Sequence, residues 1–390
     1  MAASIDVDRL WRIAEKKVGL ALPQTPDIHL EGLRCLASAM ERGGGYDTAG
    51  WRLLQRDIFA WIVAYLSFAK DRMLHPYAAD VPVVRPLFIL GFGRTGSTLL
   101  HNLLALDADA RTPALWELWS PSPPPRPDGR DRAGRIEAAQ DRLGLLAQAA
   151  PLIPEIHPMR AQAPDECHWM MRHTTLSVML YRVPEYWTWL KVLGVAELRD
   201  LYGHYRLQTQ HLQLFCRGRH WLSKAFTHLH YLPVLFDVFP DAKVVRLHRH
   251  PCRAVPSLCS LAMHYRAIYS DRLDAAEIGQ TMLDMFLDGM RRSMAVDRLQ
   301  SPQNFIDVHY AKLVADPIAV ARRIYEQFGY RYDVEFERKM REFIANDRST
   351  PVRPHSYGLE QFGLSQRGVV DRSGEYLGWV ERRGDELLEV

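Results

Sequence analysis

Short strand-like runs alternate with helix-length segments through the second half of the chain. The runs are His220–Ser223, Lys243–Leu247 and Phe305–Val308. A helix-length segment follows each of them: His230–Phe239, the segment that begins at Pro251, and Pro317–Phe328. This alternation is typical of parallel strands that are joined by right-handed helical crossovers. We therefore predict an α/β fold with a central parallel sheet.

An earlier strand is predicted at Leu87–Leu90, where four consecutive apolar residues suit a strand buried on both faces. It leads into the sequence GFGRTGSTLL and then into a helix predicted at Ser97–Leu106. Glycines let a ligand approach the backbone closely, and a helix N-terminus offers free N–H groups and the positive end of a dipole. Arg94, Ser97 and Thr98 add further donors. The segment therefore predicts an anion site.

Much of the remaining chain is predicted to be helical. Residues 1–80 have helical patterning, with a dense apolar and aromatic stretch at Asp57–Lys70. Prolines make Ser120–Pro127 a surface loop, because proline lacks an N–H and fixes φ. Residues 131–217 are again mainly helical and rich in aromatic side chains. We expect a helical segment at 1–80 and an α/β domain at 81–390 that carries a helical insertion around 131–217.

Composition and charge exclude some classes of protein. The chain has 390 residues, of which 47% are hydrophobic and 24% charged, as is ordinary for a globular protein. Its 49 Lys and Arg residues nearly balance its 46 Asp and Glu residues, and the formal net charge is +3. This balance gives no reason to expect a nucleic acid as partner, while a local basic site for a small anion remains open.

Cysteine usage and hydropathy bear on the compartment. The five cysteines are odd in number and include no Cys-x-x-Cys pair, which argues against a disulfide framework or a zinc ribbon. Free thiols fit a reducing cytoplasm, so we expect a cytoplasmic protein. The longest apolar run, Ile58–Ala69, is shorter than the roughly 20 residues that a membrane span needs. We expect no transmembrane span, and the sequence is compatible with a homo-oligomer.

Two familiar nucleotide ligands fit the glycine loop poorly. Gly91-x-Gly93-x-x-Gly96 matches the dinucleotide fingerprint, which also needs a second strand ending in an acidic residue. Glu117 has suitable spacing, but it stands in a proline-rich segment that is not a strand end. A nucleoside-triphosphate P-loop needs a lysine where Ser97 stands here. A tight turn without any ligand is a further local alternative.

Two anion-binding motifs point to a known family. The sequence Arg-Thr-Gly-Ser-Thr-Leu-Leu from Arg94, after a strand, resembles the 5′-phosphosulfate loop of sulfotransferases that use PAPS (3′-phosphoadenosine 5′-phosphosulfate). The segment VVRLHRHPCRAVPSL resembles their 3′-phosphate site, in which an arginine after a strand is followed eight residues later by a serine, here Arg249 and Ser257. An arginine fork can hold phosphate with two hydrogen bonds, and the serine hydroxyl adds a neutral donor.

Three further segments extend the resemblance over roughly residues 85–380, and it is closest to bacterial members. The segment from Lys224 to His228, with the following leucine, is similar to the family's Lys-Ser-Pro-x-His-Leu. VHYAKLVADP is similar to the segment whose tyrosine stacks on the adenine, which implies Tyr310. HSYGLEQFGLS, residues 355–365, is similar to a C-terminal segment of bacterial members.

The resemblance implies a P-loop-kinase-like sulfotransferase fold and an enzyme that moves the sulfuryl group from PAPS to a hydroxyl and releases PAP (adenosine 3′,5′-bisphosphate). The donor-binding residues that it implies are Arg94, Thr95, Gly96, Ser97, Thr98, Arg249, Ser257 and Tyr310. The family's donor needs no metal, and the adjacent ligands in His248–Cys252 do not make a tetrahedral set. We therefore expect no metal cofactor.

The chain departs from the family pattern at three places. Gly93 stands where proline is usual, Ala225 and Phe226 replace Ser-Pro, and His250 stands where Asp or Asn commonly precedes the proline. None of these changes removes a phosphate ligand. They leave room for altered donor handling or for lost activity.

Sulfuryl transfer is an in-line displacement that needs a base for the acceptor hydroxyl and cations for the charge on the leaving group. Lys224 and Arg94 are the predicted cations. For the base, the family suggests Glu117, at the spacing of the tyrosyl-protein type, or His228, in the Lys–His segment; Glu117 is slightly favoured. Asp165–Cys167 resembles a segment of bacterial members. It either helps to line the acceptor cleft or, as we favour, places its acidic residues at a helix N-terminus.

The acceptor is left open by the sequence. Many aromatic residues at 165–190 and the helical N-terminal segment suit a small-molecule or lipid-like alcohol. The alternatives are a P-loop nucleotide kinase, which Mg-dependent ATP binding would reveal, and a non-catalytic protein that binds PAP or another nucleotide.

Overall fold

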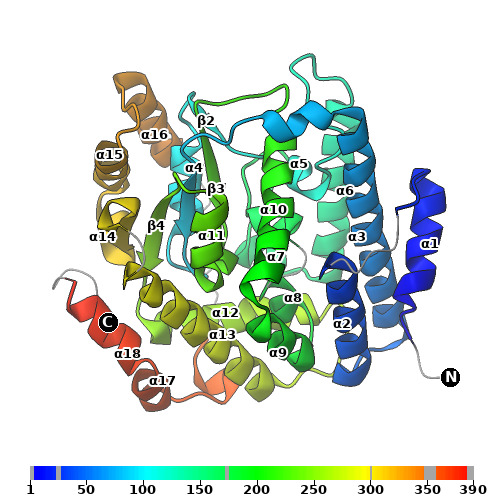
Figure 1. Cartoon of the computed structure of the whole chain (residues 1–390). Helices are drawn as coiled ribbons and strands as arrows, with labels where there is room; N and C mark the ends of the chain where they lie inside the picture. The colour runs from blue at the N-terminus through cyan, green and yellow to red at the C-terminus, as the bar shows by residue number, and fades with distance from the viewer. Residues whose placement is uncertain (1–3, 23–27, 172–174, 299–300, 347–356, 384–390) are drawn as a thin grey trace.

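A parallel sheet lies at the centre of the protein (Figure 1). The structure is a computed structural model, and it describes residues 4–22, 28–171, 175–298, 301–346 and 357–383. In these ranges the strands are β1 Leu87–Leu90, β2 Ala110–Arg111, β3 His220–Lys224, β4 Lys243–His248 and β5 Phe305–His309. Their order across the sheet is β2-β3-β1-β4-β5, and each neighbouring pair is parallel. The predicted α/β fold with a parallel sheet is confirmed.

The apolar strands are buried on both faces. Successive side chains of a strand point to opposite sides, so Leu87 and Ile89 pack into one hydrophobic cluster while Phe88 and Leu90 pack into another. All four are inaccessible to solvent. The uninterrupted apolar run LFIL is therefore the expected pattern for a strand covered by helices on both sides.

Two groups of helices cover these faces. One face packs against α4 Ser97–Leu104, α14 Tyr310–Ala315, α15 Pro317–Phe328 and α16 Val334–Asn346. The other packs against a larger set that includes α10 Val195–Leu212, α11 Leu232–Val238, α12 Pro251–Arg266 and α13 Ala275–Ala295.

The N-terminal helices lie beside α10, away from the sheet (Figure 1). They are α1 Val7–Val18, α2 Ile28–Gly43 and α3 Thr48–Leu74. The remaining α-helices are α5 Leu115–Trp119, α6 Arg132–Ala149, α7 Ile153–Ile156, α8 Thr175–Leu180, α9 Pro184–Val192, α17 Gln366–Arg372 and α18 Gly374–Glu381. Short 3-10 helices are η1 Pro76–Asp80, η2 Cys167–Met170, η3 Phe226–His230, η4 Val296–Arg298, η5 Pro302–Asn304 and η6 Glu360–Phe362. Over the described ranges, no helix is long and apolar enough to cross a membrane.

Capping residues in the sequence fix the ends of some helices. α15 begins and ends as predicted, because the Asp316 carboxylate accepts a hydrogen bond from the Ala319 N–H at 2.9 Å and Gly329 ends the helix at a φ of 65°. The helix expected over residues 230–239 is shorter, since η3 precedes it. β2 was not predicted, because two residues carry no periodicity. Residues 357–365 of the predicted C-terminal motif contain η6, and the motif's first two residues lie outside the described ranges.

Candidate active site

The carboxyl ends of the strands meet at one edge of the sheet, and the segments that leave them carry the predicted donor-binding residues. β1 leads into residues 91–96 and α4, β4 leads into α12, and β5 leads into α14. Ligands of open parallel sheets bind outside this edge. The structure thus brings three motifs that are far apart in sequence to the usual ligand-binding edge of the fold.

The turn between β1 and α4 needs its glycines. Gly96 has a φ of 83°, and a Cβ there would lie 2.6 Å from Leu313 Cδ2. A Cβ on Gly91 would lie 2.4 Å from Thr95 Oγ1. The Thr95 hydroxyl closes the turn by donating to the carbonyl oxygen of Phe92 at 2.8 Å. The resulting loop is compact, and the first turn of α4, with Ser97 and Thr98, is a candidate anion site because the N–H groups of a helix N-terminus are free to donate.

The second predicted anion site lies directly beside this loop. Arg249 Nη1 donates to the carbonyl oxygen of Arg94 at 2.7 Å, and the Arg249 guanidinium lies 4.0 Å from the centre of the Tyr310 ring. Ser257 Oγ lies 3.8 Å from the position that a Cβ on Gly93 would take. The absence of that Cβ leaves space between loop and serine. The residues that the family resemblance assigned to the donor therefore form one group.

Lys224 stands at the end of β3, next to the loop. Its position follows from strand pairing, because Lys224 is in register with Ile89 of β1. The side chain is 3% exposed. Its Nζ donates to Thr98 Oγ1 at 3.2 Å and to Glu166 Oε1 at 3.0 Å. A buried cation is thus fixed at the first turn of α4, where a cation is needed for charge on a leaving group.

Glu166 is a site residue to which the sequence assigned no chemistry. The expected helix N-terminus exists, since η2 begins at Cys167, but the Glu166 side chain does not cap it. The carboxylate instead contacts Lys224, and its Oε2 lies 3.1 Å from His168 Nδ1. Burial disfavours the charged form, but Lys224 and His168 outweigh burial and hold the pKa of Glu166 well below its usual range. In the sequence, the one sign that Glu166 belongs to the site was the resemblance of residues 165–167 to a segment of bacterial sulfotransferases.

His157 adds a half-buried imidazole near this carboxylate. Burial lowers the pKa of His157 below its usual value, while the negative charge of Asp165 opposes the change. Lys224, Glu166 and His168 also act electrostatically on it. A cluster of titratable groups therefore surrounds the end of β3.

Glu117, one of the two predicted bases, is held by an ion pair and by the backbone. Its carboxylate accepts two hydrogen bonds from Arg111, at 2.7 and 3.1 Å, and a third from the Ala114 N–H at 2.8 Å. Arg111 in turn donates to the carbonyl oxygens of Leu212 and Cys216. These bonds tie α5 to β2 and to the end of α10, and they leave little of the 8% exposed Glu117 side chain for a substrate.

His228 is completely buried in η3. Its Nδ1 lies 2.7 Å from the Tyr202 hydroxyl, and its Nε2 lies 3.1 Å from Cys167 Sγ. Burial lowers the pKa of His228 to about 3, so the ring is neutral near pH 7. With both nitrogens engaged, the side chain supports the turn that carries Glu166.

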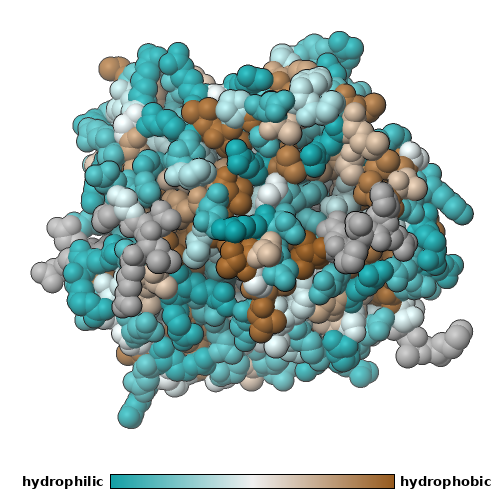
Figure 2. Space-filling view, viewed as in Figure 1, coloured by the Kyte–Doolittle hydropathy of each residue, from teal (hydrophilic) through white to brown (hydrophobic). Residues whose placement is uncertain are grey.

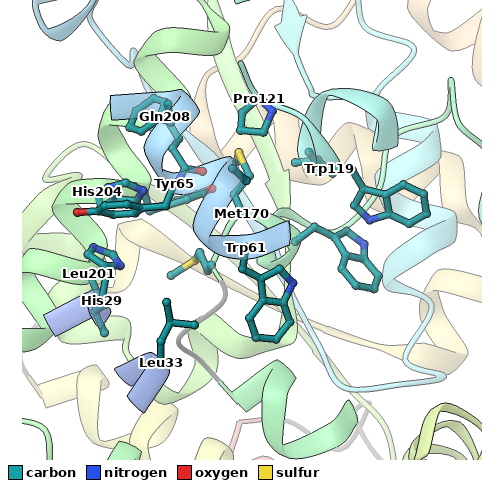
Figure 3. A pocket seen from close by; sticks show the side chains of 16 residues that line it. His29, Leu33, Trp61, Tyr65, Trp119, Pro121, Met170, Leu201, His204 and Gln208 are labelled. Carbon is teal, nitrogen blue, oxygen red and sulfur yellow. The ribbon is translucent and has the colours of Figure 1, made fainter. Parts of the chain in front are cut away.

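An apolar cleft opens on the other side of this turn (Figure 3). It holds about 730 Å³ of space between atoms, including space that is open to solvent. Its walls come from α2, α3, α5, α10 and the turn after Glu166, and they include Trp61, Tyr65, Phe68, Trp119, Trp169 and Met170. The Tyr65 and His204 rings are stacked with their centres 5.2 Å apart. On the face in Figure 2, hydrophobic side chains gather near the middle, within a mostly hydrophilic rim.

The described residues hold no group of three or more His, Cys, Asp or Glu side chains placed to bind a metal. The loop between β1 and α4 lacks the lysine of a nucleoside-triphosphate site. Two predicted anion-binding motifs nevertheless lie at the same edge of the sheet. Loop and fold together define an α/β enzyme for a nucleotide with two separate anionic groups.

The chain belongs to the sulfotransferase family, whose model matches residues 86–334. The prediction of a PAPS-dependent sulfotransferase is confirmed at the level of the family. Two curated relatives are the omega-hydroxy-beta-dihydromenaquinone-9 sulfotransferases Stf3 of Mycobacterium bovis and Mycobacterium tuberculosis. Each is 26% identical over 305 residues, which are 73% of this chain and 72% of the relative.

Solved structures of mycobacterial sulfotransferases share nearly the whole fold. Sulfotransferase STF1 of M. tuberculosis H37Rv superposes with a TM-score of 0.84 at 28% identity, over 95% of this chain and 99% of the other. STF9 of Mycobacterium avium gives a TM-score of 0.87 at 24% identity, over 99% of both chains. The N-terminal and inserted helices are therefore part of an architecture that these proteins share.

Proposed function

We propose that the sheet edge binds PAPS through the residues that the sequence singled out. The loop residues Arg94–Thr98 would hold the phosphosulfate, and Arg249 with Ser257 would hold the 3′-phosphate. Three features support this assignment: the contact between Arg249 and the loop, the open space over Gly93, and the position of Tyr310 under Arg249. Tyr310 would contact the adenine. Because the Arg249 guanidinium lies over the Tyr310 ring, the adenine and the guanidinium would both have to fit against this ring.

We further propose that the acceptor is a hydrophobic, lipid-like alcohol whose apolar part occupies the cleft. The cleft walls are mostly aromatic and aliphatic, and the curated relatives are named for a hydroxylated dihydromenaquinone. The observation that carries the proposal is the turn at residues 166–171. Its first residue contacts Lys224 beside the donor loop, and its later residues line the cleft.

The reaction follows from this arrangement. The acceptor oxygen attacks the sulfur of PAPS in line with the leaving group, and the bond from sulfur to the bridging oxygen breaks. The electron pair stays on that oxygen as PAP forms, and the acceptor proton is lost. Lys224 and Arg94 would stabilise the negative charge of the leaving group, which is the main contribution that fixed cations make to such transfers.

Ligand-dependent unfolding tests the donor assignment. In buffer without magnesium, PAP is expected to raise the Tm far more than ATP or NAD does. A ligand at 100 times its Kd stabilises a protein by about 2.7 kcal/mol. A Tm that responds to ATP with magnesium and not to PAP would overturn the donor assignment.

A sulfuryl-transfer assay tests the acceptor class. With PAPS as donor, long-chain and isoprenoid alcohols are expected to be sulfated faster than free sugars. Ala64→Phe narrows the cleft on α3, so we expect it to raise the acceptor KM about tenfold or more, because an overfilled site loses one to several kcal/mol. PAP affinity should not change. The matched control is Ala138→Phe on the exposed side of α6. Sugars as the preferred acceptors, or an unchanged KM, would contradict the assignment.

A further inference from the structure

Glu166 lies where the donor edge meets the cleft. Its Oε1 shares Lys224 Nζ with Thr98 in the first turn of α4, at 3.0 and 3.2 Å respectively. Trp169 and Met170, which follow Glu166 in the same turn, form part of the cleft wall. With an acceptor in the cleft and a donor at the loop, this turn, which begins at Glu166, would lie between the two.

Three other acid–base groups of this region already make hydrogen bonds. Glu117 is held by Arg111 and the backbone. Asp165 Oδ1 accepts hydrogen bonds from the Trp169 indole at 3.0 Å and from the Glu166 N–H at 2.6 Å. His228 is completely buried and has a partner at each ring nitrogen. Glu117 and His228 therefore cannot take a proton from an acceptor without first giving up these contacts.

One oxygen of Glu166 is poorly satisfied. Among the residues that the structure describes, Oε2 accepts no hydrogen bond of good geometry, and His168 Nδ1 lies 3.1 Å from it. The side chain is 13% exposed while Oε2 itself is buried, so an acceptor hydroxyl would reach this oxygen only after the turn moves. A buried carboxylate oxygen without a donor is unusual and indicates a missing partner.

We propose that Glu166 is the general base that accepts the proton of the acceptor hydroxyl. The inference rests on the proposed sulfotransferase function and names a catalytic residue for it. As the acceptor oxygen bonds to sulfur, its proton moves to Glu166, and the electron pair of the breaking S–O bond stays on the bridging oxygen of PAP. The protonated carboxyl returns its proton to water when the products leave.

Lys224 links this base to the donor. Without donor, the ammonium group is held between Glu166 and Thr98. The phosphosulfate is a stronger anionic partner at the same loop, so it draws Lys224 away from the carboxylate. Loss of this neighbouring charge raises the pKa of Glu166 from its depressed value and makes the carboxylate a better proton acceptor. The base is therefore strengthened only when the donor is present.

Glu166→Gln is the direct test. It keeps the size of the side chain and removes the base, so we expect kcat to fall by about 10²–10⁴. PAP binding, measured by calorimetry, should be unchanged or tighter, because Lys224 loses its competing partner. The matched control is Glu155→Gln on the exposed surface of α7, which should behave as the wild type. A larger loss of kcat in Glu117→Gln than in Glu166→Gln would overturn the proposal.

Further measurements distinguish a misfolded variant from a wrong role for Glu166 and from a wrong proposed function. Because Gln leaves Lys224 without its counterion, thermal unfolding and PAP binding of the variant show whether the site is intact. Glu166→Asp keeps the charge and should retain folding and an intermediate kcat. If the wild type binds PAP and transfers sulfuryl groups while Glu166→Gln retains full kcat, only the role of Glu166 is disproved. If the wild type does not bind PAP, the proposed function itself fails.

The pH profile of kcat gives a signature that a purely structural role would not produce. The wild-type kcat at saturating donor should fall on the acid side as Glu166 becomes protonated, and Glu166→Gln should lack this limb. The charged and titratable groups that face Glu166 are Lys224 on β3, His168, Asp165 and Cys167 in its own turn, His157 after α7, His101 on α4, His228 in η3 and Tyr265 on α12. If kcat of Glu166→Gln still falls at low pH as in the wild type, one of these other groups accepts the proton of the acceptor hydroxyl.

Discussion

The donor edge (residues 91–98, 249–257 and Tyr310) and the apolar cleft are built in different ways. At the donor edge, each contribution is a short motif that directly follows a strand, so the backbone of the sheet fixes its position. The cleft takes single side chains from α2, α3, α5, α10 and the turn after Glu166, which are distant in sequence. A site for an invariant donor can thus remain local, whereas a site for a particular acceptor depends on how separate helices pack.

Lys224 lies at the junction of the two regions, and its loss should have the largest effect. Lys224→Met removes the cation beside the loop and leaves Glu166 as a buried, unpaired charge. We expect kcat to fall by at least about 10²-fold and the folded state to lose about 3–5 kcal/mol, as for other broken buried ion pairs. Steady-state kinetics and denaturant unfolding measure both. Lys191→Met, at an exposed position on α9, is the control. If Lys224→Met keeps the wild-type kcat, Lys224 does not couple the donor edge to the cleft, and the prediction is wrong.

Arg249 tests the donor edge alone. Arg249→Ala removes the guanidinium that contacts the Arg94 carbonyl and covers Tyr310. A hydrogen bond to a charged group contributes about 1.5–3 kcal/mol, so PAP should bind roughly 10- to 150-fold more weakly. The acceptor KM at saturating donor should change little. Calorimetry with PAP provides the measurement, and Arg323→Ala on the surface of α15 provides the reference. Equal losses in donor and acceptor affinity would show that the regions are not separable.

His228 tests the support of the cleft turn through stability. Because burial lowers its pKa to about 3, the unfolded chain binds a proton near pH 6.5 that the folded chain does not. The contribution of this histidine to stability is therefore complete above about pH 6.5 and is lost as the pH falls toward 3. His228→Gln should reduce the slope of unfolding free energy against pH in this window by up to about 1.4 kcal/mol per pH unit. Denaturant titrations between pH 7 and pH 4 measure it, with His75→Gln as control. An identical slope would mean that His228 titrates freely.

The sequence by itself determined the sheet and the donor edge. Four of the strands, the helix Pro317–Phe328 and the order of the motifs follow from local signals, namely apolar runs, glycines and capping residues. Arg94 and Ser97 could be named from the glycine loop that follows a strand, whereas Arg249 and Ser257 were named from the resemblance to the family's 3′-phosphate site. In a parallel sheet the carboxyl ends of the strands meet at one edge, so local spacing already implies proximity.

Only the tertiary structure decided how the carboxylates are used. Glu117 has the right distance from the loop in sequence, but Arg111, six residues earlier, holds it in place. Glu166 gave no such signal, because it reaches Lys224 across 58 residues of chain. The cleft likewise depends on helices of the N-terminal segment packing against α5, α10 and the turn after Glu166. A proton acceptor is defined by which partners burial brings to a side chain, and such partners are set by packing between segments that local sequence patterns do not relate.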